Sequence, residues 1–106
     1  MTVLVCFCTC PDPDSARRIA DALVAERLAA CVNLVPGLRS VYRWQQGIEC
    51  SDEVLLLIKT VAARRDALCA RIVALHPYEL PEVLAVEASG GLTAYLDWVS
   101  EQTRGD

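Results

Sequence analysis

Residues 2–15 read TVLVCFCTCPDPDS and predict a strand that passes directly into a helix. Apolar, β-branched and aromatic residues fill residues 2–10 in the alternating order of a strand that is buried on both faces. Asp12 then suits a helix N-cap and Pro13 suits the first helical position, so a helix begins there. One strand face carries Val3, Val5 and Phe7, and the other carries Leu4, Cys6, Cys8 and Cys10.

Strand and helix patterns alternate through the rest of the chain. Apolar residues at helical spacing predict helices near residues 13–28, 62–75 and 92–101. Runs rich in β-forming residues predict strands at 30–44, with a bend at Pro36-Gly37, at 53–61 and at 81–87. Turn residues 45–47 join the two middle strands into an extended hairpin, whose tip we expect to project beyond the core.

The order strand, helix, strand, strand, helix, strand, helix predicts an α+β fold of the split βαβ type with an added C-terminal helix. Right-handed crossovers place both main helices on one face of the sheet. Because the other face is apolar as well, we expect the sheet of another subunit to cover it.

Length and composition restrict the class of protein. The 106 residues suit a single domain over residues 1–106, and the net charge of −4 disfavours a nucleic acid or an anionic membrane as partner. No apolar run reaches the roughly 18 residues that a membrane span needs. There is no basic, apolar export signal, so the six cysteines are expected to be reduced thiols of a cytoplasmic protein.

The spacing Cys6-x-Cys8-x-Cys10 places three sulfur atoms on one strand face, roughly 7 Å apart along the strand. It suits a site for a soft metal ion, completed by residues from another element. It also suits three small buried hydrophobic residues, because cysteine is often buried, and this interpretation is favoured for Cys6 and Cys10. Cys31, which begins the second predicted strand, is a candidate to approach these thiols.

The single histidine lies in a stiff corner, His76-Pro77-Tyr78-Glu79, between a helix and a strand. It is a candidate ligand in a loop-borne site, or a cation that stabilises the end of the helix. Lys59 ends an apolar strand and either binds an anion or extends to the surface. Tyr42 and Trp44 near the hairpin tip either stack on a ligand or anchor a subunit interface.

The chain resembles the CutA family of divalent-cation tolerance proteins over nearly its whole length. The resemblance rests on Cys8-Thr9-Cys10-Pro11-Asp12, on residues 28–33 followed by Pro36-Gly37, on residues 40–44, on Glu53-Val54-Leu55-Leu56-Leu57-Ile58-Lys59-Thr60, on His76-Pro77-Tyr78-Glu79-Leu80-Pro81-Glu82, and on residues 95–98. It implies a ferredoxin-like subunit in a tight homotrimer, with hairpins that reach across to neighbouring subunits.

The resemblance also implies a metal function. It assigns copper, or a similar divalent ion, to Cys8 and His76. Some members have a second histidine immediately before that one, and this chain has Leu75 there. The candidates for a further ligand are therefore Cys6, Cys10 and Cys31. We take Cys31 as that ligand. The alternative is a sensor similar to the trimeric PII proteins, in which a small molecule or a protein binds an inter-subunit cleft lined by Lys59, Tyr78, Glu79, Tyr42 and Trp44. No orienting group or oxyanion motif accompanies a cysteine nucleophile, so we do not expect an enzyme.

Overall fold

The computed structural model describes residues 1–105, and it has the predicted α+β element order. A short 3₁₀ turn, Ala62–Arg64, precedes the second helix. The elements are β1 (Val3–Cys10), α1 (Pro13–Ala25), β2 (Cys31–Trp44), β3 (Gly47–Val61), α2 (Arg65–Leu75), β4 (Leu84–Glu87) and α3 (Thr93–Gln102). Asp12 caps α1 as predicted, because its Oδ1 accepts a 2.7 Å hydrogen bond from the amide of Ser15.

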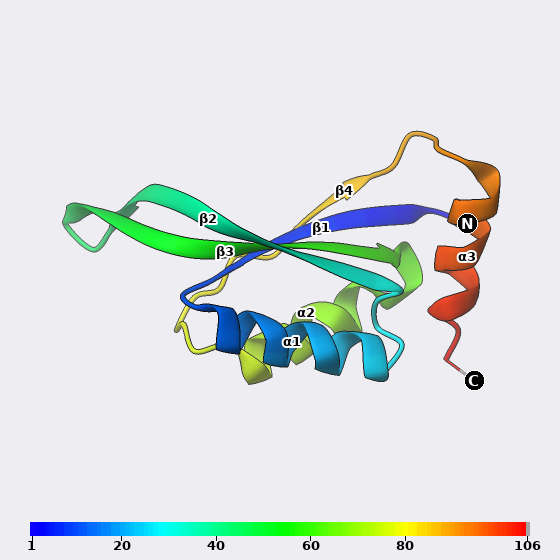
Figure 1. The fold of residues 1–106 in the computed structure, drawn as a ribbon, viewed down its shortest axis with the longest axis horizontal. Coiled ribbons are helices and arrows are strands. Elements are labelled where there is room, and N and C mark those ends of the chain that lie inside the picture. The colour runs from blue at the N-terminus through cyan, green and yellow to red at the C-terminus, as the bar shows by residue number, and fades with distance from the viewer. Residues whose placement is uncertain (106) are drawn as a thin grey trace.

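The four strands form one antiparallel sheet in the order β2-β3-β1-β4. Helices α1 and α2 lie side by side on one face of this sheet (Figure 1). The core fills the space between these helices and the sheet, and β1 contributes to it the face that carries Leu4, Cys6, Cys8 and Cys10. Its fully buried members include Cys6, Cys8, Cys10, Ile19, Leu23, Leu56, Ile58, Leu68 and Ile72.

The β2–β3 hairpin extends well past the helices, which gives the molecule its long axis of 44 Å (Figure 1). Pairing of β2 with β3 continues to Trp44 and Gly47 at the tip, so β3 begins six residues before the predicted position. The predicted bend is a register shift between Val35 and Leu38, where Gly37 adopts a φ of 82°. That left-handed backbone conformation favours glycine.

Two predicted boundaries differ from the structure for local reasons. Strand β4 begins at Leu84 rather than at Pro81, since proline has no amide proton for strand pairing. The second helix becomes α-helical only at Arg65. In residues 1–105 no helix is long and apolar enough to cross a membrane.

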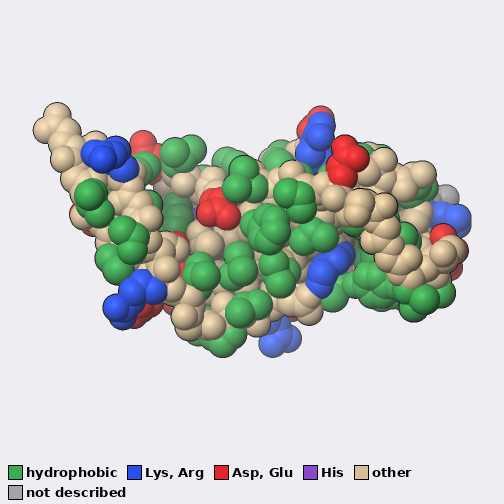
Figure 2. All heavy atoms as spheres, turned by 90° about the horizontal axis from the view of Figure 1, so that it is seen from above, with side chains coloured by type: hydrophobic (Ala, Val, Ile, Leu, Met, Phe, Trp, Pro, Cys, Tyr) green, Lys and Arg blue, Asp and Glu red, His purple; other side chains and the backbone are tan. Residues whose placement is uncertain are grey.

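Within residues 1–105, the middle of the sheet face opposite α1 and α2 is left uncovered. Figure 2 looks onto this side and shows hydrophobic side chains gathered over its middle. Register places Val86 beside Val5 and Leu84 beside Phe7, and 61% of Leu84 is exposed. Helix α3 packs at the end of the sheet, where Val99 contacts the cluster around Val3 and Val61, and leaves the middle open.

Candidate functional site

Two cysteines and the single histidine meet where β1 ends and α2 ends. Cys8 and Cys10 project from the helix-covered face of β1, and His76 immediately follows α2. One ligand atom from each residue, the two thiol sulfurs and an imidazole nitrogen, lies within 4.8 Å of the other two, and all three residues are buried. The structure therefore brings together two of the three residues predicted as metal ligands.

Both imidazole nitrogens of His76 already have hydrogen-bond partners. Nε2 lies 2.8 Å from the backbone oxygen of Thr9, and Nδ1 accepts a 3.0 Å hydrogen bond from the amide of Tyr78. This network assigns the proton to Nε2, because Nδ1 must keep its lone pair to accept. The ring also packs against Tyr78, with centroids 4.7 Å apart. His76 thus anchors the loop after α2 to β1.

The hydrogen bond between the two thiols of the cluster shifts their pKa values in opposite directions, and it lowers the pKa of Cys10 below its ordinary value. A hydrogen bond with Cys10 and burial raise the pKa of Cys8 well above its ordinary value. Burial also raises the pKa of Cys6, the next thiol on this face, to about 11. Since thiolates are the nucleophiles and the metal ligands, a metal ion has to displace the proton of Cys8, whereas Cys10 is the cluster thiol that loses its proton more readily.

The donor set fits a soft ion. Two thiols and one imidazole in a buried, apolar setting are the ligands that Cu(I) and Zn²⁺ accept, and they suit Mg²⁺ or Ca²⁺ poorly. The thiols are free to bind on losing their protons. The imidazole has to release either the Thr9 carbonyl or the Tyr78 amide before it offers a lone pair.

Cys31 does not join this cluster, which corrects the predicted ligand set. It pairs with Lys59 of β3, and Lys59 pairs in turn with Val5 of β1. Paired residues share a face and successive residues alternate, so Cys31 lies on the same face as Val5 and on the opposite face from Cys8. Cys10 takes the place expected for Cys31.

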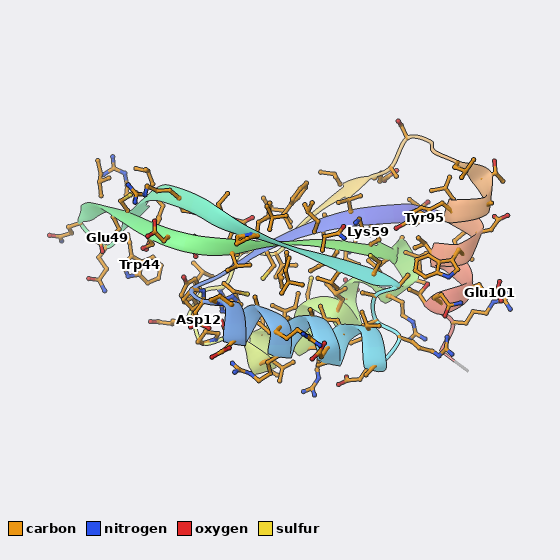
Figure 3. All side chains as sticks on the ribbon, in the orientation of Figure 1. Asp12, Trp44, Glu49, Lys59, Tyr95 and Glu101 are labelled. Atoms are coloured by element: carbon orange, nitrogen blue, oxygen red, sulfur yellow. The ribbon has the colours of Figure 1, made fainter. Side chains whose placement is uncertain are left out.

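A cleft of about 660 Å³ lies next to the cluster, beneath the hairpin. It is lined by Thr9, Ser40, Val41, Tyr42, Trp44, Glu53, Pro77, Tyr78, Glu79, Leu80 and Glu82. Four of the five residues predicted for a ligand cleft are in this set. Trp44 points from the hairpin toward the helix side of the sheet, as Figure 3 shows.

Lys59 is the exception, because it does not line this cleft of the single chain. Its Nζ donates to Oδ1 of Asn33 on the uncovered face of the sheet. Figure 3 shows it near α3 and Tyr95, far along the sheet from Trp44. The Lys59 side chain therefore lies on the uncovered face of the sheet and not in the cleft.

Glu53 is a cleft residue that sequence reasoning missed. Only 7% of it is exposed, and its Oε2 accepts a 2.6 Å hydrogen bond from the hydroxyl of Tyr78. Burial and this hydrogen bond raise the pKa of Tyr78 above its ordinary value. A carboxylate at the head of an apolar strand was the available signal, but nothing in the sequence connects it to a tyrosine 25 residues away.

Comparison with known proteins gives a consistent result. The family model described as CutA1 divalent ion tolerance protein matches residues 4–102. The divalent-cation tolerance protein CutA of Thermus thermophilus is 50% identical over 99 residues, which cover 93% of this chain and 96% of that protein. The human protein CutA is 44% identical, and the match covers 96% of this chain but 57% of the human protein.

Solved structures show the same fold. The crystal structure of CutA from Xylella fastidiosa has a TM-score of 0.94 at 51% identity and covers 96% of this chain and 98% of that one. The structure of CutA1 from Oryza sativa has a TM-score of 0.96 at 40% identity, covering 100% and 97%. This chain belongs to the CutA1 divalent ion tolerance protein family.

Proposed function

We propose that this protein takes part in metal tolerance by binding a soft metal ion, copper first, through Cys8, Cys10 and His76. The observation that carries the proposal is the buried group of two thiols and an imidazole within 4.8 Å. Such a site holds its ion away from water and from other reactants. The role is binding rather than catalysis, and the six free thiols suit a reducing compartment such as the predicted cytoplasm.

The test is an anaerobic Cu(I) titration against a coloured chelator of known affinity. We expect the binding of one equivalent of Cu(I) to be lost or strongly weakened in Cys8→Ala, Cys10→Ala and His76→Ala. Cys50→Ala is the matched control, because Cys50 is an exposed thiol on the hairpin. Circular dichroism checks that each variant is folded. Wild-type stoichiometry and affinity in folded Cys8→Ala and Cys10→Ala would refute these ligands.

We also propose that the chain assembles as a homotrimer through the uncovered sheet face and the hairpin. Support comes from the apolar residues left exposed there, among them Val41, Ile48, Leu84 and Val86. Light scattering after size exclusion tests it. Leu84→Glu should yield smaller species, whereas Val73→Glu, which changes a similarly exposed residue of α2, should not. An unchanged mass for both variants, or a monomeric wild type, contradicts the proposal.

A second candidate function is that of a sensor which binds a ligand in the cleft beneath the hairpin. The specific observation in its favour is the cleft itself, whose volume of about 660 Å³ is in the range of small-molecule sites. It adjoins the metal cluster, since Thr9 lines the cleft and also contacts His76. Ligand binding there predicts a raised melting temperature that Trp44→Ala abolishes.

A further inference from the structure

The cleft beneath the hairpin combines aromatic walls with carboxylates. Its aromatic residues are Tyr42, Trp44 and Tyr78, and its acidic residues are Glu53, Glu79 and Glu82. None of the described residues that line it is a lysine, an arginine or a histidine. Aromatic faces attract cations and carboxylates pair with them, so this lining selects a positively charged ligand.

Glu53 strengthens this argument because it is buried. Its hydrogen bond from the neutral Tyr78 hydroxyl supplies a donor but no positive charge. The ion pairs formed by the described residues include none with Glu53, Glu79 or Glu82. A carboxylate removed from water without a cationic partner is unfavourable, and a ligand cation in the cleft would compensate it.

The geometry favours an organic cation over a divalent metal ion. A metal ion needs its ligands gathered around one point, and in residues 1–105 only Cys8, Cys10 and His76 gather in that way. The three cleft carboxylates are spread out. A ligand that matches them must carry more than one positive charge along a flexible stem.

We propose that the cleft binds an aliphatic diamine or polyamine. Its methylene stem lies over the rings of Trp44 and Tyr42, and its ammonium groups meet Glu53 and the carboxylates of the loop after α2. The hydroxyl of Tyr42 contacts the hydroxyl of Ser51 at 3.0 Å, which holds that ring in place. This inference rests on the second candidate function, ligand binding in the cleft, and adds the chemical class of the ligand.

Calorimetric titration with 1,4-diaminobutane and spermidine, in low salt with a chelator present, tests the inference. The neutral 1,4-butanediol and the anionic succinate are the matched controls. We expect heat from the two amines only, with an affinity that falls as salt is added, because salt screens charge pairs. The chelator separates this result from metal binding by the thiols.

Variants place the binding in the cleft. Trp44→Ala should lower the affinity for the amines about fivefold, which corresponds to the loss of a cation–π contact. Glu53→Gln keeps an acceptor for Tyr78 but removes the charge, and it should lower the affinity for the amines by at least as much. Glu101→Gln removes an equally charged residue from α3, at the other end of the molecule, and should bind like wild type (Figure 3).

The outcomes separate the two proposals. Equal amine binding by wild type, Trp44→Ala and Glu53→Gln would overturn the inference, because the amines would then bind elsewhere. Binding of succinate or the diol, lost in Trp44→Ala, with no heat from the amines, would leave a ligand cleft but refute its cationic ligand. No heat from any of the four compounds would count against both, and would leave the metal proposal unaffected.

Discussion

The Nε2 of His76 donates a 2.8 Å hydrogen bond to the backbone oxygen of Thr9, which ties the end of α2 to β1 across 67 positions of the chain. The Nδ1 atom of the same ring accepts a hydrogen bond from the amide of Tyr78. One side chain thus serves as a structural anchor and as the proposed metal ligand. The two roles compete for its lone pairs, and the competition can be measured.

Without metal, His76→Ala should reduce the free energy of unfolding by about 2–3 kcal/mol. The substitution leaves the buried Thr9 carbonyl and the partly buried Tyr78 amide without their partner, which is the costly way to lose a hydrogen bond. Urea unfolding at one fixed protein concentration measures it. His76→Gln, which keeps a donor and an acceptor, should recover part of the loss; equal stability of wild type and His76→Ala would exclude the anchoring role.

One equivalent of Cu(I) should perturb one of the two hydrogen bonds of His76. Coordination through Nδ1 displaces the Tyr78 amide and speeds its hydrogen exchange, whereas coordination through Nε2 displaces the Thr9 carbonyl and shifts its carbon resonance. Backbone nuclear magnetic resonance distinguishes the two. Bound copper with both signals unchanged would show that the thiols hold the ion without His76.

Tyr78→Phe should destabilise the fold by about 1.5–3 kcal/mol, because the Glu53 carboxylate loses its hydrogen-bond donor. Tyr42→Phe is the matched control, since its hydroxyl contacts an exposed Ser51, and it should cost less. A difference of zero between the two would contradict the importance of the Tyr78–Glu53 pair.

The raised pKa of Tyr78 predicts the pH at which this contribution disappears. A raised folded-state pKa means that the stabilisation is complete below the ordinary value of 10.0 and is lost as pH rises toward the higher folded value. In an absorbance titration of tyrosinate formation, Tyr78→Phe should therefore lack the step that occurs at the highest pH in wild type. The free energies of unfolding of wild type and Tyr78→Phe should converge in strong base. Removal of an earlier component instead would contradict the prediction.

Asp12 predicts the opposite dependence in acid. Its hydrogen bonds with Ser15 lower the pKa of Asp12 below the ordinary 3.8, so its stabilisation is present above that value and is lost as pH falls through the lower folded pKa. Asp12→Ala should be less stable than wild type at pH 7, and the difference should shrink in acid. Equal stabilities of wild type and Asp12→Ala at pH 7 would contradict the prediction.

The sequence was sufficient for features that depend on neighbours in the chain. Alternation along residues 2–10 predicted which residues of β1 share a face, Asp12 and Pro13 predicted the start of α1, and Pro36-Gly37 predicted the bend of β2. Periodicity and capping act over a few residues, so a single sequence contains them. The long hairpin and the order of elements follow from the same information.

Tertiary structure alone decided the composition of the sites. Cys31 and Lys59 lie on the uncovered face because β3 separates β2 from β1, and its register sets which faces correspond. Cys10 rather than Cys31 completes the cluster, and Glu53 meets Tyr78 across 25 positions. The alternating pattern of a strand shows which of its residues share a face. It does not show which residues of a neighbouring strand lie on that face, since this depends on pairing between distant segments. The sequence by itself determined the elements and which residues share a face of each, and long-range strand register determined which side chains meet.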